Sequence, residues 1–177
     1  RKVVNIAHGF NMNVLAYDIE QKGAYNFVSL DELLAKSDFI SINCPLNSQT
    51  KGMINRNAFL KMKKDAILIN VARGEIVDTM ALYWALVNKK IYAAALDVVE
   101  CEEILCQTYK KCANNDGLKL MCLKKFFFIQ KLLHLPNVII TPHNAYNTKE
   151  AQIRIVELMI NELSEELLKR DIVFSIQ

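Results

Sequence analysis

Residues 66–78, AILINVARGEIVD, decide how this chain is expected to fold. The apolar run 66–72 predicts a buried strand, and Asp78 is a candidate N-cap for a helix over 78–88. Between them lie Arg73 and Gly74. A guanidinium at the end of a buried strand is costly unless an anion or carboxylate compensates it. The stretch therefore predicts a strand, a turn and a helix, and Arg73 is either a binding group or an ordinary strand end.

Strand-like and helix-like segments alternate along the rest of the chain. The predicted strands are 13–18, 39–43, 66–72, 91–98 and 137–143, and the predicted helices are 1–10, 29–36, 55–62, 78–88, 123–135 and 149–170. Apolar strands separated by helices are typical of a parallel sheet that is covered on both sides. We therefore expect an α/β fold with a doubly wound parallel sheet, of Rossmann-like type.

Composition excludes several classes of protein. The 177 residues are 52% apolar, and the formal charge of +3 arises from 22 basic and 19 acidic residues of mixed order. This charge is too weak to predict a nucleic-acid or membrane-surface partner. Five cysteines without a C-x-x-C pair, and no visible signal peptide, indicate a reduced cytoplasmic setting without a metal site. Apolar runs shorter than about 20 residues predict a soluble protein.

Three residues near strand ends form a candidate catalytic set. Ligands of such sheets bind beyond the carboxyl ends of the strands. Arg73 can bind a carboxylate through two parallel hydrogen bonds, and His143 can donate a proton if a carboxylate such as Glu102 stabilises its charged form. Each residue alone is more readily explained as an ordinary surface or strand-end residue. Together they predict a carboxylate clamp, a partner that tunes a pKa and a general acid.

Asp18 is a candidate cofactor ligand because it ends a strand that follows a helix. An acidic residue there binds the ribose hydroxyls of NAD in dinucleotide-binding units. The glycines, at 9, 23, 52, 74 and 117, include no G-x-G motif. If the chain begins inside the first helix, that motif would lie directly upstream of Arg1. An exposed turn aspartate is the alternative.

The chain resembles the cofactor domain of the D-isomer-specific 2-hydroxyacid dehydrogenases, and it looks most similar to the D-lactate dehydrogenase branch of that family. The resemblance extends over nearly the whole chain. It is carried by GFNMNVLAYD (9–18), SLDELLAKSDFISINCPLNSQTKGMIN (29–55), AFLKMKKDAILINVARGEIVDTMAL (58–82), AALDVVECE (94–102) and LPNVIITPHNAYNT (135–148).

The resemblance implies a role for each catalytic candidate. Arg73 would bind the substrate carboxylate and polarise its keto oxygen, and His143 would protonate that oxygen as NADH delivers hydride. Glu102 would keep His143 protonated. It is preferred to Glu100 and Glu103 because the family's glutamate lies five residues after the aspartate that matches Asp97.

The resemblance also implies NAD as the cofactor and a set of residues around it. Asp18 would bind the adenosine ribose, and Asp97 would contact the nicotinamide carboxamide end. The other residues expected along the cofactor cleft are Cys44, Pro45, Thr50, Val71, Ala72 and Arg73. No metal is expected.

The resemblance finally predicts how the chain is organised. Residues 1–148 would be an N-terminally truncated NAD-binding domain that lacks the first strand and the glycine-rich turn. Residues 149–177 would be a helix and tail that return to a largely absent substrate domain. We expect a fragment of an oxidoreductase that reduces pyruvate or a similar 2-keto acid to the D-hydroxy acid, inactive alone and homodimeric through this domain. The alternatives are a non-catalytic nucleotide-binding or dimerisation module, and a relative that acts on branched or phosphorylated keto acids.

Overall fold

The computed structural model describes residues 2–102 and 116–169. The chain divides into two compact units, Arg1–Pro142 and His143–Gln177. The second unit contains helix α7 (Lys149–Lys169). Among the described residues, no helix has the length and apolar character needed to cross a membrane. The same residues contain no group of three or more His, Cys, Asp or Glu side chains suited to hold a metal ion.

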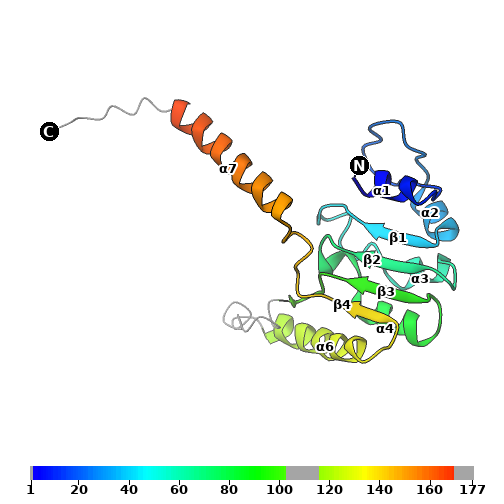
Figure 1. The fold of residues 1–177 in the computed structure, drawn as a ribbon. Helices are drawn as coiled ribbons and strands as arrows, with labels where there is room; N and C mark the ends of the chain where they lie inside the picture. Colours follow the sequence, from blue (N-terminus) through cyan, green and yellow to red (C-terminus); the bar gives the residue numbers. More distant parts are fainter. Residues whose placement is uncertain (1, 103–115, 170–177) are drawn as a thin grey trace. The chain divides into compact units, whose positions relative to one another are not determined.

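Four parallel strands form the sheet of the first unit (Figure 1). They are β1 (Phe39–Ile42), β2 (Ile67–Asn70), β3 (Ala93–Leu96) and β4 (Val138–Ile140), in the order β1-β2-β3-β4. Their register aligns the last residues of all four strands, so the carboxyl ends meet at one edge of the sheet. The expected Rossmann-like parallel α/β fold is confirmed.

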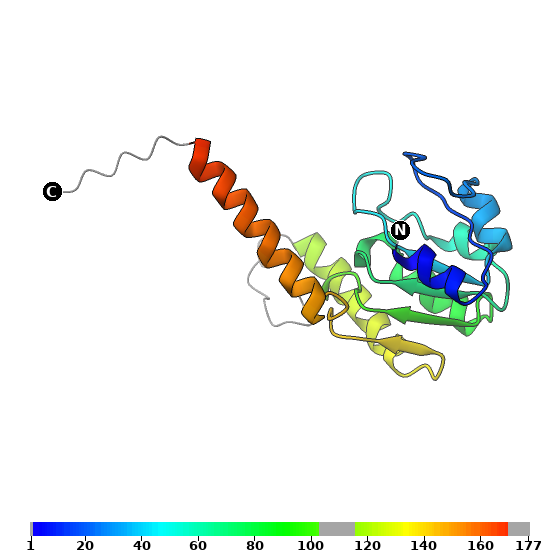
Figure 2. The same cartoon turned by 45° about the horizontal axis from the view of Figure 1, so that its top comes forward.

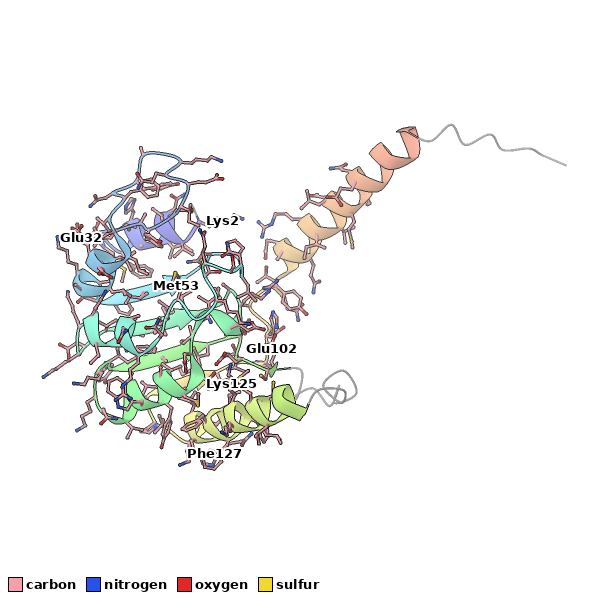
Figure 3. All side chains as sticks on the ribbon, turned by 180° about the vertical axis from the view of Figure 1, so that it is seen from behind. Lys2, Glu32, Met53, Glu102, Lys125 and Phe127 are labelled. Carbon is pink, nitrogen blue, oxygen red and sulfur yellow. The ribbon has the colours of Figure 1, made fainter. Side chains whose placement is uncertain are left out.

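The connecting helices cover one face of this sheet (Figures 1 and 3). They are α2 (Leu30–Lys36), α3 (Arg56–Lys61), α4 (Thr79–Val87) and α6 (Asp116–Leu133), and each packs against the next. Each new strand is added on the same side of the previous one, and right-handed crossovers then place the helices on a common face. The core between helices and sheet includes Phe59, Leu68, Leu82 and Ile129, all buried.

The two faces of the sheet differ in their burial. Ile40 and Leu68 face the helices and are buried, whereas Phe39, which alternates with Ile40, is 51% exposed. The expected cover on both faces is therefore not seen in the described part of the chain. Helix α1 (Lys2–Gly9), visible in Figure 2, has no buried residue. An apolar strand sequence indicates where burial is possible, and it does not supply the layer that buries the second face.

The predicted strand at 13–18 was wrong in extent. Only Ala16 pairs, in an isolated parallel bridge with Phe27. The amide of Ala16 donates to Asn26 O at 2.9 Å, and Val28 N donates to Ala16 O at 2.9 Å. A strand needs a neighbour with free backbone partners along its length, and the apolar pattern alone does not provide one.

The helix starts predicted at Ser29 and Asp78 are confirmed by their caps, whereas the helix predicted over 123–135 begins earlier, at Asp116. Ser29 Oγ accepts a hydrogen bond from Glu32 N at 3.2 Å, as the Ser-x-x-Glu pattern indicates. Asp78 Oδ1 accepts from Ala81 N at 2.9 Å and begins α4. Both caps satisfy amide groups that have no partner within the helix.

Candidate active site

The carboxyl edge of the sheet is held together by hydrogen bonds around Asp97. The amide of Asp97 donates to Asn70 O at 2.9 Å, and the amide of Thr141 donates to Leu96 O at 2.9 Å. The Thr141 hydroxyl donates to the Asp97 carboxylate. Asp97, a predicted cofactor residue, is therefore a buried group that joins the ends of β2, β3 and β4.

Asn70 shapes the turn that carries Arg73. It is 1% exposed, and its side-chain amide donates to Arg73 O at 2.9 Å and accepts from Ala72 N at 3.1 Å. The Arg73 side chain is exposed, and Nη1 donates to Ala72 O at 2.7 Å. The guanidinium therefore avoids the cost of burial that a strand-end arginine suggested. Sequence reasoning missed Asn70, although a polar residue inside an apolar run was a usable signal.

Gly74 brings the Arg73 turn into direct contact with the loop after β3. A Cβ at this position would lie 2.1 Å from the carbonyl carbon of Val99 and 2.5 Å from the amide nitrogen of Glu100. Gly74 begins the 3-10 turn η1 (Gly74–Ile76). Because Glu102 follows in the same loop, two predicted catalytic residues lie on segments whose backbones pack together.

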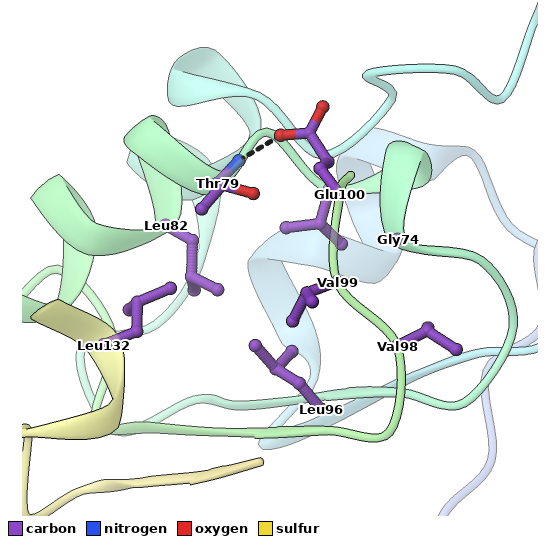
Figure 4. A pocket seen from close by; sticks show the side chains of 9 residues that line it. Gly74, Thr79, Leu82, Leu96, Val98, Val99, Glu100 and Leu132 are labelled. Atoms are coloured by element: carbon purple, nitrogen blue, oxygen red, sulfur yellow. Dashed lines mark hydrogen bonds between the residues drawn. The ribbon is translucent and has the colours of Figure 1, made fainter. Parts of the chain in front are cut away.

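The acidic residues of this loop have different environments. Glu100 is 5% exposed and accepts a hydrogen bond from Thr79 N at 2.9 Å (Figure 4). It also forms an ion pair with Lys125. Burial alone would lower the pKa of Lys125, but the hydrogen bond and charge of Glu100, with smaller effects of Cys101 and Asp78, raise that pKa overall. Glu102 is partly exposed, and Glu103 lies outside the described residues. Of the two described acids, Glu102 is therefore the more accessible, and its catalytic role stays a prediction.

His143 is the first residue of the second compact unit. Its backbone is left-handed, with φ of 51°, and its ring lies edge-on to Tyr146 with the centroids 6.0 Å apart. The structure therefore brings Arg73 and Glu102 onto adjoining segments of the first unit. The catalytic role of His143, the third member of the set, stays a prediction.

Two further predicted cofactor residues are Cys44, which follows β1, and Asp18, which follows the bridge at Ala16. Burial is the main cause of the raised pKa of the Cys44 thiol, and the charge of Asp18 raises it further. Asp18 is exposed and accepts a hydrogen bond from Glu20 N at 3.1 Å, so its carboxylate retains acceptor capacity for a ribose hydroxyl.

Thr50 closes the turn that follows Cys44. Its hydroxyl donates to Pro45 O at 2.7 Å and accepts from Asn47 N at 2.9 Å, and the residue is buried. Thr50 thus fixes the backbone that presents Pro45, which is exposed. On the neighbouring strand end, Val71 is 43% exposed. Contact of these residues with a cofactor stays a prediction.

Comparison with known proteins finds a family profile and relatives that agree with one another. Residues 1–145 match the family profile described as D-isomer specific 2-hydroxyacid dehydrogenase, NAD binding domain. A D-specific alpha-keto acid dehydrogenase of Enterococcus faecium is 40% identical over 160 residues, which are 90% of this chain and 47% of the relative. A hydroxypyruvate reductase of Thermotoga maritima is 36% identical over 170 residues, covering 94% and 49% of the two chains.

A solved structure is also similar. It is the D-lactate dehydrogenase from Aquifex aeolicus complexed with NAD and lactic acid, with a TM-score of 0.80 and 36% identity, covering 95% of this chain and 50% of that one. This chain therefore spans about half the length of the relatives it matches. The resemblance drawn from the sequence motifs is confirmed, and the chain belongs to the D-isomer-specific 2-hydroxyacid dehydrogenase family.

Proposed function

We propose that this chain is the NAD-binding half of a dehydrogenase that reduces a small 2-keto acid, with pyruvate as the favoured substrate and D-lactate as the product. The observation that carries the proposal is the packing of the Arg73–Gly74 turn against the loop of Glu102. The relatives named above support the substrate class, because the name of each refers to a 2-keto acid or a 2-hydroxy acid.

The exposed side chains suit this reaction. The Arg73 guanidinium binds the substrate carboxylate through two hydrogen bonds and polarises the neighbouring keto oxygen. His143 donates the proton that the keto oxygen takes up, and Glu102 stabilises the charged imidazole before transfer. NADH, when bound, supplies the hydride.

The residues present fit the two ends of NAD. The exposed carboxylate of Asp18 suits the adenosine ribose, and Asp97 and Arg73 lie at the strand ends expected to receive the nicotinamide. The pyrophosphate needs a glycine-rich turn before a helix, and the sequence contains no G-x-G. We propose that this turn and the substrate domain come from outside the 177 residues, so that the isolated chain does not turn over.

The domain arrangement and the partners belong to the same proposal. Residues 1–148 form the NAD-binding domain, and residues 149–177 return to the substrate domain. The protein is homodimeric through the NAD-binding domain and works in the cytoplasm. Light scattering on purified protein tests the dimer, and a monomer at micromolar concentration contradicts it.

The test uses protein expressed from the uninterrupted reading frame that contains this chain. We expect NADH oxidation with pyruvate and a D-lactate product in chiral chromatography. Arg73→Lys lowers kcat/KM about 10- to 100-fold because lysine cannot form the paired hydrogen bonds. Nearly normal kinetics in this variant would remove Arg73 from the mechanism. Tight NADH binding without any turnover would favour a non-catalytic nucleotide-binding module.

A further inference from the structure

Glu100 is a buried charge that the proposed chemistry does not use. It is 5% exposed, and its two carboxylate oxygens have different partners. Oε2 accepts the backbone amide of Thr79 at 2.9 Å, shown by the dashed line in Figure 4, and Oε1 pairs with the ammonium of Lys125. The Lys125 side chain is itself only 18% exposed. Burial of such a pair is tolerated only when both charges keep their hydrogen bonds.

The three partners belong to three different segments. Glu100 lies in the loop after β3, Thr79 is the first residue of α4, and Lys125 lies within α6. A carboxylate at the amide end of α4 also has a favourable interaction with the helix dipole. Glu100 therefore connects the loop to α4 by a hydrogen bond and to α6 by an ion pair, and these two helices pack against each other.

The same loop is in close contact with the Arg73 turn. The backbone of Val99 and Glu100 occupies the space that a side chain at Gly74 would need. Only a small cavity, of about 10 Å³, remains among these residues (Figure 4). That volume is at the lower limit for one water molecule, so the side chains fill nearly all the space beside this contact.

We propose that Glu100 is a positioning residue whose bonds to Thr79 and Lys125 hold the loop of Glu102 against the turn of Arg73. The catalytic meaning of that alignment rests on the proposed function. The mechanical coupling of the two segments does not, and it is tested separately.

Cys101 provides a local probe because it lies between Glu100 and Glu102. Its backbone is left-handed, with φ of 55°, and the residue is half-buried, while Cys122 on α6 is buried. Burial is the main cause that raises the pKa of Cys101 to about 12; Cys122 and Glu100 raise it further, and Lys125 lowers it. Release of the loop would expose this thiol and speed its alkylation.

Replacement of Lys125 distinguishes an effect of loop position on the reactivity of Cys101 from an effect of charge. In Lys125→Met, loss of the positive charge alone would raise the pKa of Cys101 further and slow its alkylation. Release of the loop would have the opposite effect. We treat the native 177-residue chain with iodoacetamide and quantify the Cys101 and Cys44 peptides by mass spectrometry. In Lys125→Met we expect Cys101 to react about 5- to 30-fold faster than in the parent chain, which corresponds to a loss of about one or two kcal/mol of local stability. Cys44 should react at its original rate.

Matched variants complete the comparison. Lys125→Arg keeps the charge and should restore the wild-type rate of Cys101. Lys63→Met removes an exposed ion pair with Asp38, of 2.8 Å, and should change neither cysteine. Lys125→Gln serves as the neutral variant if Lys125→Met does not fold. A slower or unchanged Cys101 overturns the proposal, and so does an equal increase at Cys44, which would indicate general destabilisation.

Hydrogen exchange tests the link to Arg73. Within η1, Ile76 N donates to Arg73 O at 3.4 Å, and the following Val77 N donates to Gly74 O at 3.0 Å. In the neutral Lys125 variant, these amides should exchange faster while those of β1 do not change. Unchanged exchange in η1 would overturn the coupling. Neither assay uses NADH or a keto acid, so their outcome is independent of the proposed reaction.

Discussion

Gly74→Ala provides the sharpest test of the contact between the Arg73 turn and the loop after β3. The added Cβ would lie 2.1 Å and 2.2 Å from the carbonyl carbon and oxygen of Val99, and 2.5 Å from Glu100 N. All three neighbours are backbone atoms, so rotation of a side chain cannot relieve the clash. One of the two segments must move.

The expected cost follows from two opposing effects. Overpacking a closely packed site costs about 1–3 kcal/mol, and the rigid backbone neighbours place this site near the upper end. An alanine also reduces the entropy of the unfolded chain, which offsets about 0.4–1 kcal/mol. The free energy of unfolding should therefore fall by about 2 kcal/mol. For a chain of this size, that corresponds to a Tm lower by about 4–8 °C.

Gly9→Ala is the matched control. A Cβ at Gly9, the last residue of α1, meets no atom within 4 Å, and this glycine lacks a positive φ. We expect no loss of stability there, and a gain of up to about 1 kcal/mol. Urea unfolding followed by circular dichroism compares both variants with the parent chain. If Gly74→Ala unfolds at the same urea concentration as Gly9→Ala, the close approach of the two segments is refuted.

Two further predictions concern buried polar groups. Asn70→Ala leaves Ala72 N and Arg73 O without their side-chain partner, and should lower the free energy of unfolding by about 1–3 kcal/mol in urea titrations. Asn88→Ala, at an exposed site, is the control. A smaller loss of stability in Asn70→Ala than in Asn88→Ala would contradict the role of Asn70. Stability should also fall as the pH rises from 9 towards 12, because Cys101 ionises near its ordinary pKa of 9.0 when unfolded but stays protonated to about 12 when folded. Cys101→Ser should reduce this alkaline loss, measured by urea unfolding at several pH values, and an identical pH profile would contradict it.

The fold was predictable where apolar runs meet clear caps. Strand β2 and helix α4 follow from the apolar run before Arg73 and from the N-cap Asp78, although the strand is shorter than the run. The end of an apolar run marks burial, whereas the end of a strand depends on backbone pairing with neighbours. This difference also explains why 13–18 forms a single bridge at Ala16.

The site was predictable only in part. The order of motifs identifies Arg73 and Glu102, and the structure carries them on adjoining segments. The sequence does not distinguish a buried Glu100 from a partly exposed Glu102, because two acids two residues apart in a loop have the same local pattern. Their difference arises from Lys125, which lies on a helix 25 residues away in the chain.

The burial of Glu100 changes the physical explanation of the arginine at the strand end. A buried guanidinium would need a dedicated anion, but Arg73 is exposed and its turn is fixed by the neutral amide of Asn70. Two carboxylates at this edge, those of Asp97 and Glu100, are buried, and Lys125 neutralises the second within the fold. Arg73 therefore does not need a protein carboxylate to compensate its charge, which agrees with the role in substrate binding that we propose for it. The ion pair of Glu100 and Lys125 and the exposed guanidinium of Arg73 therefore have separate environments at this edge, and only the first is buried.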